Sequence, residues 1–328
     1  MNIGIIGTGQ IAGKMAMTIN QMNNVTLYAV ASRDLSKADE FAKEYNIGKF
    51  YGSYADLVKD ENVNLVYIAT PHSHHFEHVK LCLEHNKHVL CEKSFTSNYT
   101  EAEELIYMAR QKRLLLAEAM WTRFMPMRHE LEKVICSGVI GKIQTISANL
   151  GYKEYNVKRV MKPELAGGAL LDLGVYLINF VFLVKGTEIK NTSSTAVITK
   201  TGVDLQNSIT ILYEDGCIAT LYSTAAVMTD RRACIAGSKG YIEIDNVNAY
   251  EEIRIYDESR TLINTIKREE YISGYEYEIL SCINAVMRGE VECWEMAHDE
   301  TLRVMKVMDE LRHEWGVVYP MDRNERQV

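Results

Sequence analysis

Four residues combine a reactive side chain with an apolar setting. Glu92 and Lys93 directly follow the apolar residues 89–91, and Asp172 and Tyr176 interrupt a strongly apolar segment at 169–184. Because Asp172 and Tyr176 are four positions apart, we expect them on one face of a helix. An ammonium stabilises a neighbouring phenolate, and a buried carboxylate needs a cation or hydrogen-bond donors. The set could therefore move a proton, or it could be a solvated lysine and a core tyrosine.

A glycine-rich turn stands at the start of the chain. Residues 4–12 read GIIGTGQIA, which gives G-x-G-x-x-A at Gly7, Gly9 and Ala12. The turn follows an apolar strand and opens a helix near Gln10, which is the context in which this motif binds a dinucleotide pyrophosphate. Free N–H groups and the helix dipole would hold the anion. The alternative is an ordinary glycine-rich turn between a strand and a helix.

The end of the second expected strand bears on which dinucleotide binds. An acidic residue about 20 positions beyond the motif would favour NAD, but Ser32 and Arg33 stand there, followed by Asp34. A hydroxyl and a guanidinium suit the 2′-phosphate of NADP. We interpret Asp34 as the N-cap of the next helix. The sequence thus predicts NADP as cofactor, with NAD as the alternative and a solvated Arg33 as the competing interpretation.

The elements that would position these residues alternate regularly in the first third of the chain. Short apolar runs followed by amphipathic helices predict a parallel sheet that is covered on both faces. The expected strands are residues 3–7, 25–32, 64–70, 88–93 and 114–120, and the expected helices are 10–22, 35–46, 75–86 and 99–113.

Beyond residue 120 the pattern changes to consecutive strands. A helix at 126–137, a strand at 142–152 and the apolar helix at 169–184 precede several longer strands, with YEDG and SKGY as hairpin turns. Two helices, at about 275–288 and 296–315, close the chain. Strands without intervening helices predict a second, α+β domain. We expect a dinucleotide-binding domain at 1–120 and a substrate-binding and oligomerisation domain at 121–328.

Bulk composition excludes several classes of function. The chain has 328 residues, 47% of them hydrophobic, and a net charge of −8, which argues against nucleic-acid binding. Its seven cysteines form no CxxC pair, which is typical of free thiols in a reducing compartment. The opening MNIGIIG does not resemble a signal peptide, and no uninterrupted apolar stretch reaches the roughly 18 residues of a membrane span. We expect a cytoplasmic protein without a membrane partner.

Several motifs together resemble the Gfo/Idh/MocA oxidoreductases. The matching segments are residues 4–12, ATPHSHH at 69–75, CEKSF at 91–95 and GGALLDLGVY at 167–176, and together they extend over most of the chain. EAMWTRF and LCEK make the chain similar to the dimeric dihydrodiol dehydrogenase-like branch. The resemblance implies a Rossmann domain followed by an α+β domain with an open-faced, mostly antiparallel sheet. It also implies a homo-oligomer, dimer or tetramer, formed through that sheet.

The resemblance assigns catalytic roles. Lys93 occupies the place of the family's strand-end lysine, beside the nicotinamide ribose and the substrate hydroxyl. Tyr176 stands where the dihydrodiol branch has its acid/base tyrosine, and Asp172 would orient the substrate or Lys93. Ser94 departs from the family's proline, and serine does not fix the backbone dihedral as proline does.

The resemblance also implies a set of cofactor-binding residues. Three histidines lie close together in residues 72–75, but no carboxylate or cysteine complement accompanies them, so we expect no metal. Trp121 and Arg123 could contact the substrate, or could serve interdomain packing. The expected cofactor-binding residues are Gly7, Thr8, Gly9, Gln10, Ile11, Ser32, Arg33, Thr70, Pro71, His72, His75, Glu92, Lys93, Trp121 and Arg123.

These residues predict an NAD(P)-dependent oxidoreductase that acts on the secondary alcohol or carbonyl of a sugar, polyol or dihydrodiol. A non-catalytic NAD(P)-binding sensor on the same fold is the alternative, but a sensor would not need Lys93, Asp172 and Tyr176 together. A sugar or inositol dehydrogenase would differ only in its substrate. The loop at 153–168, which would shape the pocket, has no readable pattern.

Overall fold

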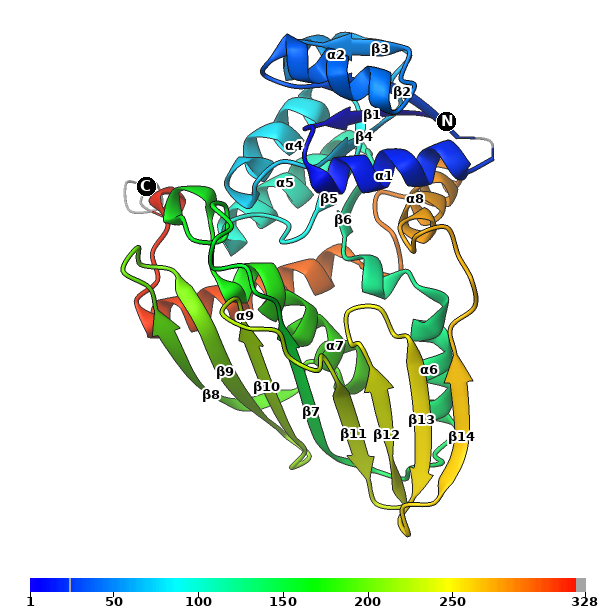
Figure 1. Cartoon of the computed structure of the whole chain (residues 1–328), viewed down its shortest axis with the longest axis vertical. Coiled ribbons are helices and arrows are strands. Elements are labelled where there is room, and N and C mark those ends of the chain that lie inside the picture. The colour runs from blue at the N-terminus through cyan, green and yellow to red at the C-terminus, as the bar shows by residue number, and fades with distance from the viewer. Residues whose placement is uncertain (24, 323–328) are drawn as a thin grey trace. The chain divides into compact units, whose positions relative to one another are not determined.

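The computed structural model describes residues 1–23 and 25–322. These residues form two compact units (Figure 1). The first contains Met1–Phe124 and Tyr271–Met305, and the second contains Met125–Glu270 and residues 306–322. The observed division differs from the expected one, because the chain returns to the first unit after residue 270. It then leaves that unit again within its last helix.

The first unit is built on a six-stranded parallel sheet of order β3-β2-β1-β4-β5-β6. Its central strands are buried along nearly their whole length, as expected for a sheet covered on both faces. The elements are β1 (Asn2–Ile6), α1 (Gln10–Gln21), β2 (Thr26–Ala31), α2 (Leu35–Glu44), β3 (Lys49–Tyr51), α3 (Tyr54–Lys59), β4 (Leu65–Ile68), η1 (His72–His74), α4 (His75–Glu84), β5 (His88–Glu92), α5 (Tyr99–Lys112), β6 (Leu116–Ala119) and η2 (Trp121–Arg123).

The strand order reverses between β1 and β4, which pair with each other although β2 and β3 lie between them in sequence. In open parallel sheets, ligands bind beyond the carboxyl ends of the strands at such a switch point. The sheet order confirms the predicted doubly wound fold. The short elements β3 and α3 were not predicted.

Helix α8 (Glu276–Arg288) belongs to this unit and lies beside α1 (Figure 1). The Thr18 hydroxyl of α1 lies 2.7 Å from the Ser273 hydroxyl, just before α8 begins. Helix α9 (His298–Trp315) starts in the first unit and ends in the second.

The second unit contains an eight-stranded sheet of order β14-β13-β12-β11-β7-β10-β9-β8, in which only the β7–β10 pairing is parallel. This confirms the mostly antiparallel sheet and both hairpins. Its elements are α6 (Pro126–Cys136), β7 (Ile143–Gly151), η3 (Pro163–Leu165), the π turn η4 (Leu170–Gly174), α7 (Val175–Lys185), β8 (Ile189–Ile198), β9 (Asp204–Tyr213), β10 (Ile218–Thr224), β11 (Ala233–Gly237), β12 (Gly240–Asp245), β13 (Glu252–Asp257) and β14 (Leu262–Lys267).

One face of this sheet is covered and the other is open. Helices α6 and α7 lie behind the strands in Figure 1, and no helix of the described chain covers the front. In β10, the buried Ala219 and Leu221 alternate with the exposed Ile218, Thr220 and Tyr222. Such alternation is typical of a sheet with one buried face.

The apolar helix of the second unit is a core element. The segment Pro163–Lys185 is long and apolar enough to cross a membrane by length and composition, although the sequence predicted no span. However, 83% of its most apolar 18-residue window is buried within the protein. Only its first part departs from the expected α-helix, because Leu170–Gly174 form a π turn.

Candidate active site

The glycine turn lies at the switch point of the parallel sheet. Gly7 has a positive φ of 107°, and a Cβ there would stand 2.7 Å from the carbonyl oxygen of Ala69, in the loop after β4. Only glycine fits this close approach. At Gly9 a Cβ would meet nothing within 4 Å, so the backbone just before α1 faces open space. These features fit a dinucleotide pyrophosphate at the start of α1, where Thr8, Gln10 and Ile11 are at least partly exposed.

The end of β2 presents a guanidinium without a carboxylate partner. Asp34 accepts a hydrogen bond from the Ser36 amide at 3.0 Å, which confirms that it caps α2. Ser32 is buried, and Arg33 is exposed and makes no ion pair with any described residue. Burial and the nearby Arg33 lower the pKa of His74. An exposed cation at the carboxyl edge of β2 fits a 2′-phosphate.

His75 connects the loops that follow β4 and β5. Its ring is fully buried, with Nδ1 3.0 Å from the carbonyl oxygen of Ser94 and Nε2 2.7 Å from that of Thr70. Burial lowers the pKa of His75 to about 4. The side chain therefore contacts backbone carbonyls and holds the segment after Lys93 in place. His72 is also buried, and Pro71 is half-buried. Within residues 1–23 and 25–322, no His, Cys, Asp or Glu cluster is arranged to hold a metal.

Glu92 and Lys93 stand at the carboxyl end of β5. Glu92 is buried, accepts a hydrogen bond from the Tyr67 hydroxyl and lies 3.3 Å from the backbone nitrogen of Lys93, which donates to it. The Lys93 side chain is partly exposed, and the Lys93–Ser94 peptide bond is cis. Lys93 thus occupies the edge of the sheet where ligands bind, as predicted from the strand pattern.

Trp121 and Arg123 have partners within the first unit. The Trp121 ring stacks on Tyr275 with centroids 5.0 Å apart. Arg123 is only 2% exposed, and its Nη2 lies 2.8 Å from Oε2 of Glu300. The charge of Arg123 is therefore balanced inside this unit, which favours a packing role, whereas the partly exposed Trp121 can still contact a ligand.

The second unit brings Asp172 and Tyr176 together with a residue that was not predicted. Asp172 is buried in the π turn, and Tyr176 is partly exposed at the start of α7. Nη1 of Arg159 lies 2.7 Å from Oδ1 of Asp172. Arg159 belongs to the loop at 153–168. The signal that could have found it is the rule that a buried carboxylate needs a cation.

The predicted site residues therefore form two groups. Gly7, Gly9, Arg33 and Lys93 lie at the carboxyl edge of the parallel sheet in the first unit. Asp172 and Tyr176 lie together in the second unit.

Two family models match the chain. Residues 1–120 match the model described as an oxidoreductase family with an NAD-binding Rossmann fold, and residues 129–243 match the GFO/IDH/MocA C-terminal domain. Curated relatives include the trans-1,2-dihydrobenzene-1,2-diol dehydrogenase of Xenopus tropicalis, 33% identical over 97% of this chain and 98% of the relative. The enzyme of that name from Mus musculus is 32% identical over 98% of both chains. These relatives confirm the similarity to the dihydrodiol dehydrogenase-like branch.

Solved structures support the fold. A 3-ketoreductase from Actinomadura kijaniata, in complex with NADP and TDP-benzene, has a TM-score of 0.86 at 23% identity, over 95% of this chain and 97% of that one. A levoglucosan dehydrogenase, in complex with NADH and levoglucosan, has a TM-score of 0.84 at 18% identity, over 96% and 97%. The chain belongs to the Gfo/Idh/MocA family of oxidoreductases, with an NAD-binding Rossmann fold over residues 1–120.

Proposed function

We propose that this chain is an NADP-linked dehydrogenase that acts on the secondary alcohol or carbonyl of a sugar, polyol or trans-dihydrodiol. The observation that carries the proposal is the pair Asp172 and Tyr176, in which a buried, charge-balanced carboxylate stands four positions before a partly exposed phenol. A phenol in that setting suits proton exchange with a ligand. The curated relatives named as dihydrodiol dehydrogenases support the substrate class.

The proposed reaction separates hydride transfer from proton transfer. A bound nicotinamide supplies the redox chemistry by accepting or returning a hydride. During alcohol oxidation, Tyr176 as phenolate takes the hydroxyl proton, and the C–H electron pair leaves as hydride. The Lys93 ammonium stabilises the phenolate and the developing oxyanion. Asp172 orients the substrate or Lys93. In the reverse direction, Tyr176 gives its proton to the carbonyl oxygen.

The preference for NADP over NAD rests on Arg33. Its exposed guanidinium has no carboxylate partner among the described residues, and Asp34, the nearest acidic residue in sequence, is engaged as a helix cap. An exposed cation without a carboxylate partner among the described residues, next to an engaged carboxylate, favours a phosphorylated ribose over a ribose diol.

A non-catalytic dinucleotide sensor is the second candidate. The open backbone at Gly9 and the exposed Arg33 would serve a sensor as well as an enzyme. The group around Tyr176 favours the enzyme, because binding a dinucleotide does not require a phenol beside a buried carboxylate.

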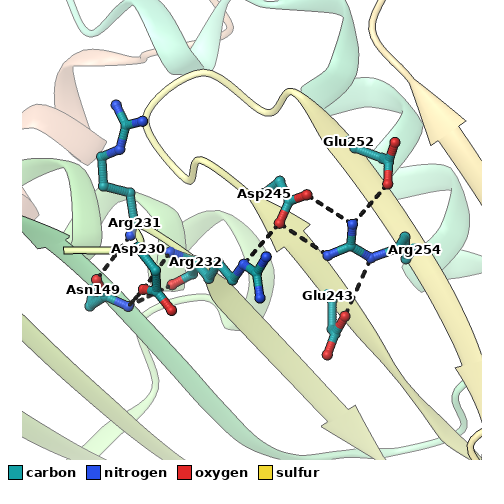
Figure 2. A network of polar contacts seen from close by, with 8 residues as sticks. All are labelled: Asn149, Asp230, Arg231, Arg232, Glu243, Asp245, Glu252 and Arg254. Atoms are coloured by element: carbon teal, nitrogen blue, oxygen red, sulfur yellow. Dashed lines mark hydrogen bonds and ion pairs between the residues drawn. The ribbon is translucent and has the colours of Figure 1, made fainter.

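We further propose that the chain forms a homo-oligomer through the open face of the second sheet. Figure 2 shows Arg254 on this sheet surrounded by Glu243, Asp245 and Glu252, with Asp245 also paired with Arg232 at 3.1 Å. Balanced charges of this kind suit a self-complementary surface, as a two-fold dimer requires. Replacing the exposed Tyr222 with lysine should then lower the oligomer size in light scattering. An unchanged size would contradict this interface.

A cytoplasmic location is proposed from the seven cysteines, none of which stands in a CxxC motif.

A substrate screen tests the proposed function. Polyols, sugars and trans-dihydrodiols are offered with NADP, and ketoses and diketones with NADPH, while the nicotinamide absorbance is followed. We expect at least one class to be turned over faster with NADP(H) than with NAD(H). Tight NADPH binding without turnover of any compound would favour the sensor instead.

A further inference from the structure

The carboxylate of Asp204 holds the start of the segment that carries Asp172 and Tyr176. Asp204 is the first residue of β9 and is fully buried. Its Oδ2 accepts a hydrogen bond of 2.8 Å from the backbone nitrogen of Leu170, the first residue of the π turn. The N–H groups at the start of a helix have no partners within it, and a carboxylate is a favourable acceptor there. Asp204 thus caps the turn from a strand 34 residues further along the chain.

The hydrogen bonds of this turn lead from Leu170 to the residue before Tyr176. The carbonyl oxygen of Leu170 accepts from the backbone nitrogen of Val175, which has the five-residue spacing of a π turn. Next to it, the backbone nitrogen of Asp172 donates to the carbonyl oxygen of Gly168 at 3.2 Å. The place of Leu170 therefore determines the place of Val175, and through the backbone that of Tyr176.

Asp204 is itself held by its surroundings. The Asn207 side-chain nitrogen donates to Oδ2 of Asp204 at 2.8 Å, and the Ser223 hydroxyl donates to Oδ1 of Asn207 at 3.0 Å. Asn207 lies on β9 and Ser223 on β10, and both are buried. Oδ1 of Asp204 lies against Gly168, where a Cβ would overlap it, and Gly168 has a φ of 120° that favours glycine. The carboxylate is thus confined between the sheet and the turn.

We propose that Asp204 is a positioning residue for proton transfer: by holding the Leu170 amide, it fixes the start of the π turn and so places the Tyr176 hydroxyl for the substrate proton. The inference rests on the proposed acid/base role of Tyr176 and deepens it. Proton transfer needs the two groups within hydrogen-bond reach, and a displacement of about 1 Å can lower a rate about 10²-fold. Loss of this anchor therefore lowers kcat, although Asp204 is buried and acts only through the backbone.

Steady-state kinetics of three variants, with a substrate identified by the screen, test this role. In Asp204→Ala, which removes the acceptor, we expect kcat to fall about tenfold or more, with the dissociation constant for NADPH within about twofold of the wild type. Asp204→Asn keeps an oxygen that can accept from Leu170, so its kcat should stay within about threefold of the wild type. Ile242→Ala removes fully buried apolar atoms from β12, and should lower the unfolding temperature without changing kcat well below it.

A double variant separates an effect on Tyr176 from a general loss of structure. If Asp204 acts by placing the Tyr176 hydroxyl, Asp204→Ala should lower kcat much less in the Tyr176→Phe background than in the wild type, because the group that it places is already absent. An equal fractional loss in both backgrounds would show that Asp204 does not act through this hydroxyl.

Three further results would overturn the inference: a normal kcat in Asp204→Ala, the same loss in Asp204→Asn as in Asp204→Ala, or the same loss in Ile242→Ala, which would attribute the effect to lowered stability. Thermal unfolding and NADPH binding establish which variants are folded. If Asp204→Ala does not fold, Asn207→Ala carries the test. It removes a donor that holds Oδ2 of Asp204 and should lower kcat about threefold or more, whereas an unchanged kcat would overturn the inference.

Failure of this inference can be told apart from failure of the proposed function. If Tyr176→Phe retains full turnover, the proposed function itself has failed. If Tyr176→Phe is impaired and Asp204→Ala keeps its kcat, only the role of Asp204 has failed.

Discussion

The hydroxyl of Tyr67 donates a hydrogen bond to Oε1 of Glu92, joining two buried side chains near the carboxyl ends of β4 and β5. The second carboxylate oxygen of Glu92 accepts from the backbone nitrogen of Lys93. Glu92 thus connects Tyr67 on β4 with the backbone of Lys93, the residue that is proposed to lie beside the nicotinamide ribose.

Removing the Tyr67 hydroxyl should destabilise the fold. Tyr67→Phe leaves a buried carboxylate short of one donor, so we expect the free energy of unfolding to fall by about 1–3 kcal/mol. Denaturant titration measures this change. Tyr107→Phe, at a tyrosine that is 65% exposed on α5, is the matched control. Equal stability of Tyr67→Phe and the wild type would show that the bond contributes nothing.

Glu278 should make stability depend on pH. It is fully buried on α8, and neither of its carboxyl oxygens has a hydrogen-bond partner within the described residues. Burial raises the pKa of Glu278 well above its ordinary value, and Glu92 raises it further. The pKa of Glu278 is higher in the folded protein than in the unfolded chain. The contribution of Glu278 to stability is therefore complete below the unfolded-chain pKa and declines as the pH rises from that value to the folded-state pKa.

Glu278→Gln removes that decline. Relative to the wild type, its free energy of unfolding should increase by up to about 1.4 kcal/mol for each pH unit above the ordinary carboxyl pKa of 4.5, until the pH reaches the raised pKa of Glu278 in the folded protein. The quantity compared is the slope of the free energy of unfolding against pH, because the glutamine side chain also changes the stability by an amount that does not depend on pH. Glu310→Gln, at an exposed position on α9, should follow the wild-type slope. Parallel curves for Glu278→Gln and the wild type would mean that Glu278 is ionised in the folded protein.

Arg33 should discriminate between the two dinucleotides. Arg33→Gln removes a charge-assisted contact to the 2′-phosphate, so NADPH should bind about 10- to 100-fold more weakly, with little change for NADH. Fluorescence titration with each dinucleotide measures this. Lys37→Gln, at an exposed position on α2, controls for the loss of one positive charge. A wild type that prefers NADH, or an equal loss for both dinucleotides, would remove Arg33 from this role.

Regular patterns in the sequence predicted most of the fold. Fully apolar strands, amphipathic helices and the two hairpin turns appear as expected, because each has a local physical signature. The π turn at Leu170–Gly174 was not predictable, since its residues are as apolar as those of an α-helix. Nor does any local pattern show that α8 packs with the first sheet, because a helix's amphipathicity does not identify its partner.

The candidate site was predictable where a motif has a fixed geometry. Gly7, Gly9 and the N-cap Asp34 have the conformations that their motifs require. The pairing of Arg159 with Asp172 depends on the course of an irregular loop, and no spacing rule predicts such a contact. Glu278 in the sequence YEYE looks like a solvated charge, and only the fold shows that it is buried.

Turnover by Tyr176→Phe tests the central claim most directly. The account predicts that kcat falls by roughly 10²–10⁴-fold, while the dissociation constant for NADPH stays within about twofold of the wild type, since binding does not use the phenol. Tyr107→Phe, at a tyrosine that is 65% exposed on α5, should keep full activity. Full turnover by Tyr176→Phe on a verified substrate would contradict the account.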